Sequence, residues 1–146
     1  MPQSPLIPIL AIGGGAALLL AMSGGGKKSP TKEEEELKKL SCPLIDTMID
    51  PNTGFLQIRR LDVMQDSAEA AALQLGVTKR SQLTQHRKAL MVSALRGLTT
   101  ECNWDLIIGA YFSDDPKKLG AISANTLTAI KAADTIVEKL RLEQDI

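Results

Sequence analysis

The side chains that most often perform chemistry in proteins are sparse in this sequence. It contains one histidine, His86, and two cysteines, Cys42 and Cys102, among 146 residues. It contains no glycine-rich phosphate loop, G-x-S-x-G nucleophile elbow, H-E-x-x-H zinc motif or C-x-x-C pair. The sequence therefore predicts no catalytic, cofactor-binding or metal-binding residue, and no small-molecule substrate.

His86 and Glu101 are the residues closest to a catalytic grouping. His86 lies between Gln85 and Arg87, on the polar side of a predicted helix. A single exposed histidine is far more often a surface residue than a general base. Glu101 stands beside Cys102 but has no partner visible in the sequence. We therefore expect that the protein is not an enzyme.

The two cysteines allow two interpretations. They are too few for the disulfide framework of a small secreted protein, and their spacing fits no metal site. Free cysteines are often buried as small apolar side chains, which favours two buried thiols. The alternative is one disulfide between Cys42 and Cys102, which would require that the domain face an oxidising space.

Residues 70–81, AAALQLGVTKRS, resemble a helix-turn-helix motif. In that motif a small residue lets two helices cross closely, a glycine makes the turn, and the second helix presents basic groups to DNA. Gln82 stands where the motif has an apolar residue, and Leu83 follows one position late. A plain helical hairpin explains the same letters. The resemblance implies nucleic-acid contacts by Lys79, Arg80, Arg87 and Lys88.

Charge and composition do not favour nucleic acid as the main partner. The chain has 17 basic and 17 acidic residues, so its formal net charge is zero. A neutral chain has no long-range attraction to phosphates, and binding would depend on a local patch.

Aromatic residues make up 3% of the chain, so alanine, leucine and isoleucine must supply the core. The length supports one domain.

The apolar stretch at residues 6–22, LIPILAIGGGAALLLAM, carries no charge. As a helix it would be about 25 Å long, slightly short of the roughly 30 Å hydrocarbon core of a bilayer. We interpret it as a single transmembrane anchor. A cleaved signal peptide, a buried core helix and a membrane-active arm stored in a particle are the alternatives. No basic residue precedes the stretch, which opposes the signal peptide.

Two features of this segment predict how it sits in a bilayer. Lys27, Lys28 and Lys32 follow it and no basic residue precedes it. The excess of basic residues after the span places the N-terminus outside and the domain on the cytoplasmic or interior side. Small residues four apart let membrane helices approach closely. The residues predicted to pack against another helix are Ala11, Gly13, Gly15 and Ala17.

The chain divides into three predicted regions. Residues 1–26 form the anchor and a glycine joint, residues 27–41 a charged juxtamembrane spacer, and residues 42–146 a helical interaction domain. In the spacer, Thr31 can cap a helix whose first turn is acidic.

The fold class predicted for the domain is mainly α, a bundle of about four helices. The turn Asp50–Gly54 indicates a short hairpin at 48–58. Hydrophobic periodicity predicts helices at 63–75, 81–98, 103–112 and 123–142. In the last helix the apolar residues follow a seven-residue repeat and form one seam. This seam either belongs to the core or pairs with a second copy. The seam residues are Leu127, Ile130, Ala133, Val137 and Leu140.

These observations favour a structural function. We expect a membrane-anchored adaptor that docks on neighbouring proteins of a membrane complex or of a membrane-containing virion. The expected partners are the lipid bilayer and other membrane or structural proteins, with a second copy of the chain among them. A membrane-tethered nucleic-acid-binding protein that uses residues 79–88 is the alternative.

Overall fold

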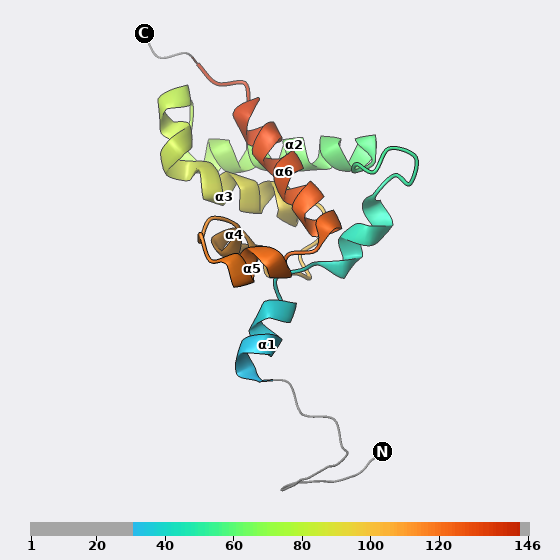
Figure 1. Ribbon diagram of the computed structural model, residues 1–146. Helices are drawn as coiled ribbons and strands as arrows, with labels where there is room; N and C mark the ends of the chain where they lie inside the picture. Colours follow the sequence, from blue (N-terminus) through green and yellow to red (C-terminus); the bar gives the residue numbers. More distant parts are fainter. Residues whose placement is uncertain (1–30, 144–146) are drawn as a thin grey trace, which may run out of the picture. The chain divides into compact units, whose positions relative to one another are not determined.

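The computed structural model describes residues 31–143, which form short helices joined by loops (Figure 1). Within this part of the chain there is no β-strand, only two isolated bridges. The mainly α fold is therefore confirmed for the domain. In chain order the elements are α1 (Lys32–Lys38), the 3-10 helix η1 (Pro43–Met48), α2 (Ile58–Leu75), the 3-10 helix η2 (Arg80–Gln82), α3 (Leu83–Arg96), α4 (Trp104–Tyr111), α5 (Pro116–Ala121) and α6 (Ala124–Glu138).

None of the described helices has the length and apolar character that a membrane crossing needs. Residues 6–22 lie outside the described residues. The predicted anchor and its packing positions, Ala11, Gly13, Gly15 and Ala17, therefore stay predictions.

Helix α3 is the centre of the domain. It packs against α2, α4 and α6, and Figure 1 shows α6 crossing α2 and α3. The apolar periodicity that predicts a helix at 81–98 marks its inner face, since these residues are all buried: Leu83, Leu90, Met91, Ala94, Leu95 and Leu98.

The seam of α6 belongs to the same core. Ile130, Ala133, Val137 and Leu140 are buried, and Leu127 is half-buried against the core. Because the seam faces α3 and α2, it is not free to pair with a second copy.

Small residues bring α2 and α3 together. Ala68 and Ala72 are buried on the inner face of α2. A Cβ atom added at Gly97, just after α3, would collide with the side chain of Ser67. Glycine therefore allows the close approach of the two backbones at this point.

Helix α2 ends as the sequence predicts but begins earlier. Gly76 adopts φ 71°, and Val77 N–H donates to the Ala72 carbonyl over 2.8 Å, which closes the helix in the manner of a Schellman motif. The helix starts at Ile58 rather than at residue 63. The hairpin predicted at 48–58 is reduced to one antiparallel bridge, Ile49 with Leu56, because the second arm enters the helix.

Local hydrogen bonds explain two further differences from the prediction. Helix α5 was not predicted, because six residues are too few for a periodic pattern. Its start is fixed by Pro116 in the first turn and by Asp115, whose side chain accepts a hydrogen bond from Lys117 N–H over 3.0 Å. Helix α6 ends at Glu138, and the chain continues as a loop to Glu143, which bridges to Lys79.

Candidate interaction surface

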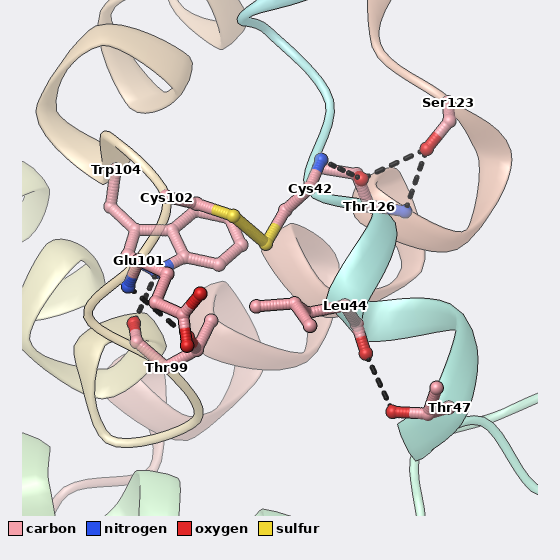
Figure 2. Close-up of a disulfide and its surroundings, with 9 residues drawn as sticks. All are labelled: Cys42, Leu44, Thr47, Thr99, Glu101, Cys102, Trp104, Ser123 and Thr126. Atoms are coloured by element: carbon pink, nitrogen blue, oxygen red, sulfur yellow. Dashed lines mark hydrogen bonds between the residues drawn. A yellow bond between two sulfur atoms is a disulfide. The ribbon is translucent and has the colours of Figure 1, made fainter.

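A disulfide joins Cys42 to Cys102 (Figure 2). The two Cα atoms are 5.8 Å apart although the residues are separated by 60 positions. Cys42 precedes η1, and Cys102 lies in the loop between α3 and α4. The prediction of two buried thiols is therefore wrong. Burial of Cys42 is as expected, but only the folded chain brings the second sulfur to it.

The disulfide lies in a core where the neighbouring polar groups are paired (Figure 2). Trp104 is buried beside it, and its Nε1–H donates to the Thr99 carbonyl over 2.9 Å. Cys42 N–H donates to Thr126 Oγ1 over 2.9 Å, and Ser123 Oγ donates to the same atom over 2.8 Å. Cys42 is fully buried and Cys102 is half-buried, and the bond acts as a structural crosslink between two segments of the core.

The two candidates for acid–base chemistry do not meet in a site. His86 is half-exposed on α3, and Glu101 is exposed. The backbone N–H of Glu101 donates to Thr99 Oγ1 over 3.1 Å, which is a turn interaction. Between residues 31 and 143, no three His, Cys, Asp or Glu side chains lie close enough to hold a metal ion.

Arg80, one of the four residues predicted to contact nucleic acid, closes the end of α6. Its guanidinium donates to the carbonyls of Glu138 and Leu140. A cation at this position also suits the negative end of the helix dipole.

Gln82 also caps the end of a helix, in this case the start of η2. Its Oε1 accepts from the backbone N–H groups of Thr78 and Lys79 over 2.8 and 2.9 Å. This cap explains why a polar residue stands where the helix-turn-helix motif has an apolar one. Leu83, one position later, is buried in its place.

Arg87 is also engaged within the fold. Its Nη2 lies 2.6 Å from both carboxylate oxygens of Asp134, and its Nε lies 3.0 Å from Oδ1. The hydrogen bonds that Arg87 donates to Asp134 raise the pKa of Arg87. The guanidinium carbon and the Lys88 ammonium lie 5.6 and 5.4 Å from the centre of the Phe112 ring, within cation–π range. The ion pair between Arg87 and Asp134 therefore links α3 to α6.

The four basic residues therefore do not form one free patch. Arg80 and Arg87 bind groups of α6, whereas Lys79 and Lys88 are exposed. Contact with nucleic acid stays a prediction for this run, and the two lysines are the residues that could make it without breaking a hydrogen bond to α6.

No family model, no curated protein and no solved structure matches this chain. Its function must therefore be argued from its own surface.

An open pocket of about 370 Å³ lies where the end of α2 faces the segment 140–143 that follows α6. We call it the C-terminal pocket. Leu73, at its edge, is 79% exposed. The segment is held in place because Arg80 N–H donates to the Glu143 carbonyl and Glu143 N–H donates to the Thr78 carbonyl. The pocket is lined by Glu69, Ala72, Leu73, Val77, Thr78, Leu140, Arg141, Leu142 and Glu143.

A second apolar feature lies at the start of α2. Phe55 and Ile58, which we call the apolar tip, are 68% and 79% exposed. The loop that carries them is ordered by hydrogen bonds, because Asp50 N–H donates to the Phe55 carbonyl and Gln57 N–H to the Met48 carbonyl. Gly54, at φ 76°, allows the turn between them.

The sequence contained a signal for both features, although it did not lead to their prediction. The hydrophobic pattern placed Leu73 off the inner face that Ala68 and Ala72 define. The hairpin that the sequence predicts at 48–58 would cover one of the two side chains Phe55 and Ile58. In the structure both remain uncovered by the domain.

Proposed function

We propose that this protein is a membrane-anchored structural adaptor, whose helical domain docks on neighbouring proteins and whose residues 6–22 cross the bilayer. The anchor rests on the uncharged sequence of that segment. The docking role rests on the surface of the domain.

One observation carries the docking role. Large apolar side chains are exposed at both ends of α2, at the apolar tip and beside the C-terminal pocket. Singly exposed apolar residues are common on any protein. Here, however, Phe55, Ile58 and Leu73 are at least two-thirds exposed on backbone that hydrogen bonds hold in place. Apolar features on ordered backbone lose little entropy when a partner covers them, which favours protein docking.

The disulfide bears on the side of the membrane. Disulfides persist in oxidising compartments and are rare in the cytosol. Lys27, Lys28 and Lys32 predict the opposite, an interior domain. The lysine count is a statistical tendency of flanking residues, whereas the disulfide joins two segments of the core. We therefore propose that the domain folds in an oxidising space, and the interior orientation stays the competing prediction.

The orientation is tested by alkylation in acid-quenched cells or particles. If the domain folds in an oxidising space, Cys42 and Cys102 take up no alkylating reagent until a reductant is added to the denatured protein. Modification of both cysteines without reduction would instead support the interior orientation.

The adaptor function is tested in native membranes. The full chain should remain in the pellet after alkaline carbonate extraction. A photo-crosslinking amino acid at Leu73 or Phe55 should give adducts with protein, whereas the same amino acid at Asp105, an exposed position on α4, should not. Release by carbonate would contradict the anchor. Absence of a protein adduct at both apolar positions would contradict the docking role.

A further inference from the structure

We propose that the partner at these surfaces is a second copy of the chain, with the apolar tip of one copy in the C-terminal pocket of another. This inference rests on the proposed docking function and names its partner. Three features of the domain support it.

The first feature is the match between the two apolar surfaces. The floor of the pocket is made by Ala72, Val77 and Leu140, which are buried side chains, and its edge by Leu73. Its volume, about 370 Å³, lies just above the roughly 300 Å³ at which pockets for small ligands begin. A pocket of that size accepts one or two apolar side chains. The tip offers such a group in Phe55.

The second feature is charge. The pocket rim carries Glu69 and Glu143 against one basic residue, Arg141, so it is acidic by one charge. Arg59, next to Ile58 at the tip, is exposed and basic. Opposite charges around an apolar contact orient the partners and exclude wrong ones.

The third feature is the position of the two surfaces on α2. The tip lies at its start and Leu73 near its end, about 22 Å apart at 1.5 Å per residue. Because the length of α2 separates the two surfaces, the tip cannot reach the pocket of its own chain. The contact therefore joins two different copies. It gives a two-fold dimer where it is reciprocal, and a ring or an open row of copies where it is not. Each of these products suits a structural protein.

The apolar contact is small, so one such interface is weak. Anchoring in one membrane raises the local concentration of the copies and compensates for a weak contact.

The experiment uses the purified full chain in lipid vesicles that contain no other protein. One pool carries a photo-crosslinking amino acid at Phe55, and an equal pool is labelled with ¹⁵N. Illumination should give a mixed-isotope adduct that maps to residues 72–77 or 140–143 of the second copy. The same amino acid at Asp105 is the matched control and should give none.

Charge reversal tests the geometry. Arg59→Glu and Glu143→Lys, each used alone, should lower the yield of the mixed adduct about fivefold, the upper range for an exposed ion pair. Both positions are exposed, so both variants should keep the fold. Mixing an Arg59→Glu tip with a Glu143→Lys pocket should restore the yield.

Two outcomes overturn the self-pairing. The first is an adduct that maps elsewhere on the second copy, or to lipid alone. The second is a charge reversal without effect on the yield. If protein adducts with a different chain still form at Phe55 or Leu73 in native membranes, the adaptor function stands while its partner is not a second copy. If they do not form there either, the adaptor function fails as well.

Discussion

The hydroxyl of Thr126, on α6, accepts the backbone N–H of Cys42 over 2.9 Å, and the two residues are 84 positions apart. Thr126 is fully buried, and among the described residues it is the only buried polar one. Its Oγ1 also accepts from Ser123. The hydrogen bond between Cys42 N–H and Thr126 Oγ1 holds the segment that carries Cys42 against the start of α6.

Replacing Thr126 with valine should therefore destabilise the domain. The substitution keeps the shape but leaves Cys42 N–H buried without an acceptor, which costs about 1–3 kcal/mol. Chemical denaturation followed by circular dichroism measures the change. Thr135→Val, at an exposed position of the same helix, is the control and should change stability by less than about 0.5 kcal/mol. Equal effects of the two variants would contradict the role of the hydrogen bond.

Removing the disulfide should have a larger effect. For cysteines separated by 60 residues, loop-closure entropy gives a stabilisation of about 4 kcal/mol. The double variant Cys42→Ala, Cys102→Ala should unfold at lower denaturant than the oxidised protein. Reduction of the wild type should lower the midpoint to a similar degree, while the double variant should not respond to reductant. A wild type insensitive to reduction would argue against the bond.

Arg87 should stabilise the folded domain through the paired hydrogen bonds of its planar guanidinium as well as through its charge. Its side chain is 38% exposed and that of Asp134 is 23% exposed, so solvent screening keeps the contribution small. Arg87→Ala should lower the free energy of unfolding by about 1 kcal/mol. Arg87→Lys should recover only part of that loss, because an ammonium cannot donate to both carboxylate oxygens in parallel. Full recovery by lysine would show that charge alone matters.

The close approach of Gly97 to Ser67 predicts that a larger residue at position 97 destabilises the domain and that a smaller residue at position 67 relieves the effect. Gly97→Ala should destabilise the packing of α3 on α2 by about 1–3 kcal/mol, because the new Cβ meets the Ser67 side chain. In the Ser67→Gly background the same change should cost less. Thermal unfolding of the four proteins gives the coupling energy. Additive effects would mean that the two residues do not meet.

Nucleic-acid binding should be tested at the lysines. The fourfold change of Lys79, Arg80, Arg87 and Lys88 to alanine would remove two contacts with α6 and confuse unfolding with lost binding. The double variant Lys79→Ala, Lys88→Ala leaves those contacts in place. We expect the full chain in detergent to show no binding to duplex DNA at about 150 mM salt, where non-specific binders reach roughly 10⁻⁴ to 10⁻⁶ M. Salt-dependent binding that the double variant abolishes would support the nucleic-acid alternative.

The sequence by itself determined where the four longest helices of the domain lie and most of the faces that they bury. Periodic apolar residues predicted α3 and the seam of α6, and Gly76 predicted the end of α2, because these signals act within a few turns of one helix. Even there the boundaries differ, since α6 ends at Glu138 and not at residue 142, and Arg80 binds the Glu138 carbonyl.

Only the tertiary structure decided the features that depend on distant residues. The Cys42–Cys102 bond, the Thr126 acceptor and the Arg87–Asp134 pair each join segments dozens of positions apart. No local pattern encodes such meetings, because they follow from how the helices cross. The same holds for the C-terminal pocket and the apolar tip. Side chains on outward faces become candidate docking surfaces only when the packed domain leaves them uncovered.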